Sequence, residues 1–250
     1  MYNIADTFIV GRFLGKNALA AVDGTYTLKT FLYSIIIGLC MGCGSLVSYC
    51  FSEVNECRLK GCLNISFLMI GSVTLVTEPI TLCFSNEILK LLHTPMKIML
   101  LTSDYVRIIL SGIIFIFLYN FYSFMIRGIG NSLTPLILLG SRSVLNIILD
   151  IIFVADLDMG VKGAAYATVI SQAVSGVGLC FYTLAKELLL RLSFKKKFWK
   201  DSSFGEVVRM STAASVQQSV MNFGILMIQG LVNSFGTAVM AAFTVAVHNC

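Results

Sequence analysis

The sequence predicts an all-α membrane protein, a helix bundle whose chain crosses the bilayer several times. Hydrophobic residues make up 57% of the 250 positions and charged residues only 12%, against roughly 45–50% and about 25% in soluble proteins. These proportions exclude a soluble enzyme. The apolar residues form long continuous runs, whereas an outer-membrane barrel would show short alternating strands. Short connections separate the runs, so neighbouring helices are expected to be antiparallel.

Six full spans are predicted, because each run has the roughly 20 apolar residues that a bilayer core requires. In chain order they cover residues 28–52, 61–84, 105–126, 133–155, 161–185 and 207–234. Residues 1–14 reach only about 21 Å as a helix, so we expect a truncated first span, and a last run that opens near residue 238 is cut short. Segment 87–104 interleaves apolar and basic residues and is expected to lie along the membrane interface.

Basic residues indicate which helix ends face the cytoplasm. Six lysines and arginines lie between residues 186 and 200, and by the positive-inside rule this linker, at about 186–206, is cytoplasmic, as are the loops of Arg58 and Arg127. The loop with Asp156 and Asp158 then faces outside. Much of the net charge of +5 lies in the linker, which favours anionic lipid headgroups over nucleic acid as its partner.

Two short segments of the chain are alike. Residues 13–22 and 234–243 each have a glycine followed five residues later by Ala-Ala, between two apolar runs. About six spans separate them, so both have the same orientation, as in the parallel repeats of two-lobed secondary transporters. We therefore expect residues 1–200 to form an N-terminal lobe with its cytoplasmic linker, and residues 207–250 to begin a second lobe.

Polar residues inside the apolar runs indicate where the chemistry lies. Only Asp6, Glu78 and Asp150 are acids well inside such runs, and a carboxylate there is costly unless it is paired, protonated or facing a cavity. Asn146 precedes Asp150 by four residues and so shares its helix face. In the next run Thr168 and Gln172 have the same spacing. Two neighbouring helices therefore offer paired polar groups to one cavity.

The depths of the two aspartates agree with a shared cavity. Asp6 lies about eight residues before its outer loop and Asp150 about six before Asp156. These spacings correspond to roughly 12 and 9 Å below the outer surface. The alternative is that both side chains reach up to the membrane interface.

Several motifs together resemble one transporter family. Their order along the chain is Tyr2-Asn3-Ile4-Ala5-Asp6 with Gly11-Arg12, Arg127-Gly128-Ile129-Gly130-Asn131 with Pro135, Asn146-Ile147-Ile148-Leu149-Asp150, and Gly160-Val161-Lys162-Gly163-Ala164-Ala165 with Thr168. This pattern resembles the multidrug and toxic compound extrusion (MATE) transporters, from within family helix one to the start of helix eight. The resemblance implies two six-helix lobes. It also implies an N-lobe site for protonation or sodium binding at Asp6, Asn146, Asp150 and Thr168.

The resemblance implies a cation-coupled antiporter of the bacterial plasma membrane, not an enzyme, that exports amphipathic organic cations by alternating access. We expect a monomer without cofactor other than the coupling proton or sodium, the latter at Asp6 and Asp150. Gln172, Tyr119 and Tyr122 are weaker expectations for the substrate cavity. Two alternatives stay open: a lipid-linked oligosaccharide flippase of the same superfamily, which should use several arginines or lysines, and a non-functional membrane fragment.

Three further features are left open by the sequence. Glu78, beside Pro79, is expected to reach the interface, and Arg142 is expected either to pair across helices or to reach lipid phosphate. The second lobe has no acid between Glu206 and Cys250, where some relatives carry a coupling glutamate, so coupling is expected in the first lobe. Cys40 and Cys43 form a C-x-x-C pair, but no second pair or histidine accompanies it, so no metal site is expected.

Overall fold

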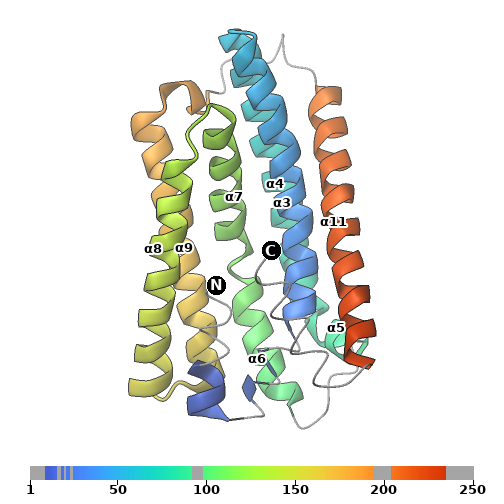
Figure 1. Ribbon diagram of the computed structural model, residues 1–250, viewed down its shortest axis with the longest axis vertical. Helices are drawn as coiled ribbons and strands as arrows, with labels where there is room; N and C mark the ends of the chain where they lie inside the picture. Colours follow the sequence, from blue (N-terminus) through green and yellow to red (C-terminus); the bar gives the residue numbers. More distant parts are fainter. Residues whose placement is uncertain are drawn as a thin grey trace.

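The computed structural model describes residues 9–15, 18–19, 21–22, 25–91, 98–193 and 204–234, and within these ranges it contains helices and no strands (Figure 1). The all-α prediction is confirmed. Residues 9–14 are helical. The longer elements are α3 (Tyr26–Ser52), α4 (Glu56–Cys83), α5 (Ser85–Leu91), α6 (Met99–Leu110), α7 (Ile113–Gly128), α8 (Leu133–Asp150), the π-helix η1 (Ile151–Asp156), α9 (Gly160–Lys186), the 3-10 helix η2 (Leu188–Leu190) and α11 (Phe204–Ser234).

The long helices run antiparallel along the long axis of the molecule (Figure 1). The turn between α3 and α4, the turn between α7 and α8, and the end of α9 lie at one end of the bundle, which is the upper end in the figure. The turn between η1 and α9 lies at the opposite end, near α5 and α6. The loops that the basic residues assign to one side of the membrane therefore share one end of the bundle.

The surface of α8 is inverted relative to a soluble helix. Its buried residues are Pro135, Arg142, Asn146 and Asp150, while its exposed side chains include Leu136, Ile137, Val144 and Ile148. An apolar outer face and a polar inner face are typical of a helix whose solvent is lipid. By length and composition four helices of the described chain can cross a membrane, and a fifth if α6 and α7 count as one bent span.

The structure differs from the predicted segments at three places. The span predicted at 105–126 is two helices, α6 and α7, that meet at a 43° bend. The chain bends at Gly112, where an added Cβ would lie 2.9 Å from the side chain of Val169 on α9. Residues 99–104, expected at the interface, belong to α6. α11 has the predicted length, but it is more polar and is not among the four apolar helices.

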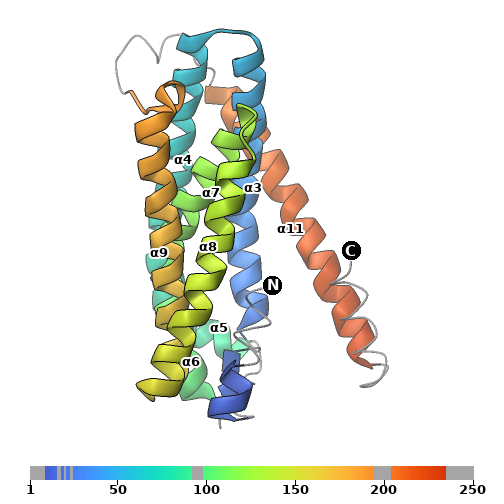
Figure 2. The ribbon, with the colours of Figure 1, turned by 60° about the vertical axis from the view of Figure 1, so that its left-hand side comes forward.

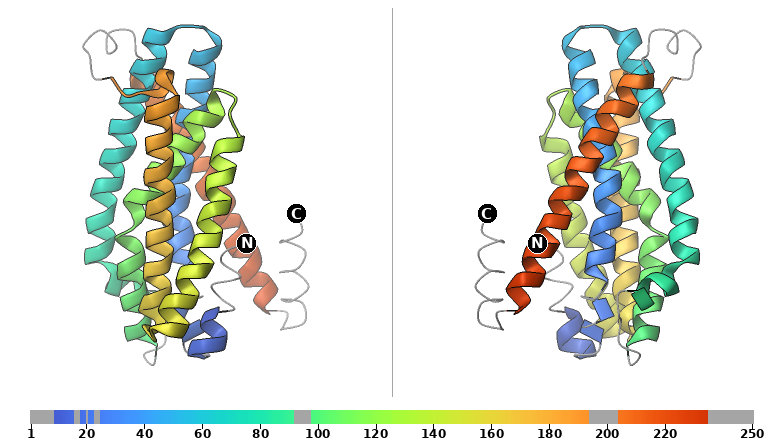
Figure 3. Two further views of the ribbon diagram at one scale, coloured as in Figure 1. Left: turned by 90° about the vertical axis from the view of Figure 1, so that its left-hand side faces the viewer. Right: turned by 90° about the vertical axis from the view of Figure 1, so that its right-hand side faces the viewer.

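α11 packs on α3 through very small residues. A Cβ added to Gly42 would lie 2.3 Å from the carbonyl oxygen of Met210, and one added to Gly38 would lie 2.5 Å from the Cα of Ser215. The two backbones can approach this closely only because glycine has no side chain, as at small-residue crossings of membrane helices. Figures 2 and 3 show that α11 meets α3 near its first residues and diverges from the bundle toward its other end.

An arginine joins three elements at the upper end of the bundle. Arg58 of α4 makes ion pairs with Glu53, at 2.6 Å, and with Glu206 at the start of α11, at 2.8 Å. Asn55 caps α4, because its side chain accepts a hydrogen bond from the Arg58 backbone amide. These contacts fix the start of α11 against the first helices, although exposed ion pairs of this kind contribute only about 0–1 kcal/mol each.

Candidate functional site

The polar residues predicted on α8 and α9 are all buried in the bundle. Asp150 is 0% exposed, Asn146 and Gln172 are 1% exposed, and Thr168 is 2% exposed. α8 and α9 are packed against each other along the molecule (Figure 1). The structure therefore brings four of the predicted site residues onto the buried faces of two adjacent helices, while Asp6 lies outside the described residues.

The two helices are antiparallel, so their polar residues alternate in depth. Counted from the turn that joins η1 to α9 at the ideal rise of about 1.5 Å per residue, Asp150 lies at about 9 Å, Thr168 at about 12 Å, Asn146 at about 15 Å and Gln172 at about 18 Å. Arg142, one turn beyond Asn146 on the same face, lies at about 21 Å. We call these five residues the polar ladder.

Two amides in the ladder have no hydrogen-bond partner within the described chain. This holds for the nitrogen and the oxygen of both Asn146 and Gln172. The buried amide of Asn64 on α4 differs, because its nitrogen donates to the Ser193 carbonyl at 2.6 Å and its oxygen accepts from the Ser193 amide at 3.1 Å. Buried amides are normally satisfied. Asn64 is therefore a structural residue, whereas Asn146 and Gln172 have the character of binding groups.

This contrast predicts opposite effects of one substitution at two positions. Asn64→Leu should destabilise the protein by about 1–3 kcal/mol, because it leaves the Ser193 backbone groups unsatisfied. Asn146→Leu should be neutral or stabilising, since it removes polar atoms that no described group satisfies. The thermal unfolding midpoints of the two purified variants in detergent decide this. A larger loss for Asn146→Leu than for Asn64→Leu would contradict it.

The oxygen atoms of the ladder suit a small cation or a proton. Asp150 supplies a carboxylate and Asn146 an amide oxygen, while Thr168 donates its hydroxyl hydrogen to the Ala164 carbonyl at 3.0 Å and keeps its lone pairs. Hard cations prefer such oxygen donors. Directly after Asp150 the helix changes to the π-helix η1, and single π-helical turns recur at functional sites. No pattern in the sequence indicates this change.

A hydrophobic cluster separate from the main core joins the first described helix to the helices that hold the ladder. Ile9 and Val10 are packed in one cluster with Val154, one turn after Asp150, and with Ala164, one turn before Thr168. Segment 9–14 therefore lies against the helices that hold the ladder, nearer than Asp150 to the turn that joins η1 to α9. Asp6 lies outside the described residues, and its depth stays a prediction.

The tyrosines expected at the substrate cavity lie in the main core. Tyr119 is 5% exposed and donates a hydrogen bond to the Pro135 carbonyl of α8 at 2.9 Å. Tyr122 is 2% exposed and packs edge-on against Phe121, with 5.3 Å between the ring centroids. Both have structural contacts, and their part in a cavity stays a prediction. Arg142 is 8% exposed, so it points into the bundle and not toward lipid phosphate.

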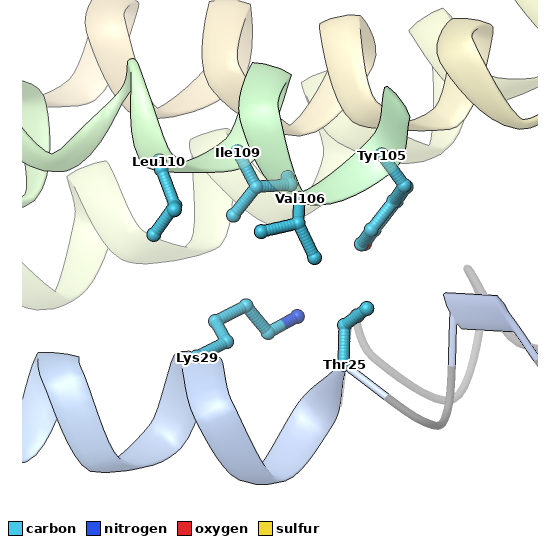
Figure 4. Close-up of a pocket in the computed structure, with 6 residues that line it drawn as sticks. All are labelled: Thr25, Lys29, Tyr105, Val106, Ile109 and Leu110. Carbon is cyan, nitrogen blue, oxygen red and sulfur yellow. The ribbon is translucent and has the colours of Figure 1, made fainter. Parts of the chain in front are cut away.

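Other polar positions lie apart from the ladder. Glu78 is partly exposed and precedes Pro79 within α4. The sequence did not single out Lys29 or Tyr105, which line a small pocket between α3 and α6 with Thr25, Val106, Ile109 and Leu110. Figure 4 shows the Lys29 amine pointing from α3 toward α6. Tyr105 is 2% exposed and belongs to the same hydrophobic cluster as Val154.

Known proteins resemble this chain over nearly its whole length. It is 28% identical over 242 residues to the probable multidrug resistance protein YpnP of Bacillus subtilis, covering 97% of this chain and 54% of the relative. It is 22% identical over 248 residues to the multidrug export protein MepA of Staphylococcus aureus, covering 98% and 54%. The chain thus spans about half the length of these relatives.

The fold agrees with solved transporter structures. A MATE transporter in the straight conformation superposes with a TM-score of 0.85 at 23% identity, covering 98% of this chain and 55% of that one. The Vibrio cholerae MATE transporter VcmN in its bent form gives 0.82 at 25% identity, covering 99% and 56%. The model of the MatE family matches residues 1–152, which include the ladder residues Arg142, Asn146 and Asp150. The chain therefore belongs to the MatE family of multi-pass membrane transporters.

Proposed function

We propose that this chain is the coupling half of a cation-driven antiporter that exports amphipathic organic cations. The observation that carries the proposal is the polar ladder: a buried carboxylate and two unsatisfied buried amides inside helices whose outer faces are apolar. Such groups inside a membrane bundle mark ion or substrate paths. The names of the relatives, which describe multidrug resistance and export, support the proposed cargo.

The mechanism follows from differential binding. A proton or sodium ion at Asp150, with Asn146 and Thr168 as further oxygen ligands, stabilises one arrangement of the two lobes. A cationic substrate at the same carboxylate stabilises the other arrangement, because it replaces the ion as the counter-charge. Release of one is then linked to binding of the other. Asp6 is the proposed second carboxylate of this site, and the bacterial plasma membrane is the proposed location.

Transport by reconstituted protein tests the proposal. A full-length protein with this chain as its first half is reconstituted in liposomes. It should move ethidium against the ethidium concentration gradient when a proton or sodium gradient is imposed. An ionophore that collapses the gradient should stop this movement. Ethidium movement that is equal with and without either gradient would contradict cation coupling.

The flippase alternative needs several basic side chains facing the cavity. Among the side chains that the structure describes, Arg142 is the one lysine or arginine classed as buried. A pyrophosphate carries more negative charge than one guanidinium balances. The described residues therefore favour a cargo of lower negative charge.

The proposed topology gives a further prediction. In a cysteine-free background, Ser202→Cys in the basic linker should resist a membrane-impermeant thiol reagent in intact cells. Asp158→Cys, in the exposed turn at the opposite end of the bundle, should react readily. Both should react after the cells are permeabilised. The reverse pattern would show that the positive-inside assignment is wrong.

A further inference from the structure

α11 is buried against the other helices near its own beginning. Among its described side chains, residues 204–224, the buried ones are Val207, Ser211 and Ser215, which lie four residues apart on one helix face. After Ser215 the described side chains are partly or fully exposed, and Figures 2 and 3 show α11 diverging from α3 in this direction. The contact therefore lies at the end of the bundle that the basic residues assign to the cytoplasm.

The buried face of α11 meets α3 through small side chains. Ser211 lies against Cys43, with 2.9 Å between Oγ and Sγ, and the Ser215 hydroxyl donates a hydrogen bond to the Ile35 carbonyl at 3.2 Å. Of the described residues of α11, Val207 alone belongs to the main hydrophobic core. α11 can therefore separate from α3 with a small loss of apolar burial.

An ion pair closes the same contact at its cytoplasmic edge. Arg58 of α4 reaches Glu206 of α11 at 2.8 Å, and it also pairs with Glu53, which follows α3, at 2.6 Å. Its guanidinium lies over the ring of Tyr49 on α3, 5.6 Å from the ring centroid, a position in which the ring attracts the positive charge. Glu53 and Tyr49 thus hold the guanidinium from the side of α3 and α4, so that it is directed toward Glu206.

We propose that the Arg58–Glu206 ion pair is a cytoplasmic latch between the two lobes, which must break each time the transporter opens toward the cytoplasm. This inference rests on the proposed alternating access and on α11 as the first helix of the second lobe. When two lobes rock against each other, a contact between them at one end forms in one arrangement and is lost in the other. Arg58 is thus a positioning residue that sets the balance between the two arrangements.

Thiol labelling measures this balance. Cys43 is 0% exposed behind Ser211, so in full-length protein with Cys43 as its only cysteine the thiol reacts when α11 moves away. Inside-out membrane vesicles present the cytoplasmic side to a membrane-impermeant maleimide. Glu206→Gln should raise the labelling rate about three- to fivefold, because an ion pair of this exposure shifts an equilibrium by a factor of that order.

Glu53→Gln is the matched control, since it removes the other acid from the same arginine but leaves the contact with α11. Its labelling rate should stay within about twofold of wild type. Glu206→Arg should label faster than Glu206→Gln, and the double variant with Arg58→Glu, which restores an ion pair of reversed polarity, should label more slowly than Glu206→Arg. Equal rates for Glu206→Gln and Glu53→Gln, or no slowing in the double variant, would overturn the latch.

A cross-link tests the movement itself. A disulfide between Cys43 and Ser211→Cys fixes α11 on α3, so it should stop gradient-driven ethidium efflux from proteoliposomes, and dithiothreitol should restore the efflux. Unchanged efflux after complete cross-linking would overturn the inference while leaving the export function standing. Absence of gradient-driven efflux before cross-linking would instead overturn the export function, and the labelling rates would then decide whether the latch exists.

Discussion

Asp150→Asn should abolish gradient-driven efflux while leaving the protein folded and expressed. The amide is nearly isosteric with the carboxyl group, but it cannot take up a proton or supply a full negative charge. Asp150 is 0% exposed, and asparagine has nearly the same volume as aspartate, so the fold should be retained. Efflux of ethidium from proteoliposomes and the thermal unfolding midpoint separate the two effects.

Asp156→Asn is the matched control for this prediction. Asp156 lies six residues further along the same span but is exposed, so its substitution should leave efflux at the wild-type rate. Asp6→Asn should behave like Asp150→Asn, and the double variant should be no worse than either single one if the two carboxylates act as a unit. Wild-type efflux in Asp150→Asn would show that the carboxylate has no coupling role.

Gly42→Ala should separate α11 from α3. The new Cβ would lie 2.3 Å from the Met210 carbonyl oxygen and 2.7 Å from the Cα of Ser211, and backbone atoms cannot move aside as a flexible side chain can. We expect the packing of the two helices to weaken by about 1–3 kcal/mol. This loss occurs although alanine favours a helix by roughly 1 kcal/mol over glycine.

A disulfide reports this packing directly. The Sγ atom of Cys43 and the Oγ atom of Ser211 are 2.9 Å apart, so in a background without other cysteines Ser211→Cys should cross-link to Cys43 under oxidation with copper phenanthroline. Gly42→Ala should reduce the yield strongly. Gly140→Ala on α8, where an added Cβ meets nothing within 4 Å, should leave the yield unchanged. An equal yield in both variants would contradict the close approach.

The helices and the ladder were predictable because lipid imposes simple rules. Apolar length indicates a span, and a four-residue spacing places Asn146 and Asp150 on one face regardless of the rest of the fold. The structure confirms that face as buried. The short polar turns likewise predicted the antiparallel order, since a chain cannot cross the bundle within three or four residues.

Other features depend on contacts that no local pattern encodes. The bend falls at Gly112, where the side chain of Val169 on α9 approaches closely. η1 follows Asp150 directly, and no proline or glycine lies within it. The pairing of Gly38 and Gly42 with α11 joins residues about 170 positions apart. Arg142 could be placed on the ladder face from its spacing, but only burial separates an inward guanidinium from one that reaches lipid phosphate.

Competition between the cationic dye rhodamine 6G and the coupling ion tests the central role of Asp150 most directly. If a proton or sodium ion and a cationic substrate share this carboxylate, the Kd of full-length wild-type protein for rhodamine 6G should rise as protons or sodium are added, because linked ligands weaken each other reciprocally. In Asp150→Asn the Kd should not change with either ion. The same dependence on pH or sodium in wild type and Asp150→Asn would show that the coupling site lies elsewhere.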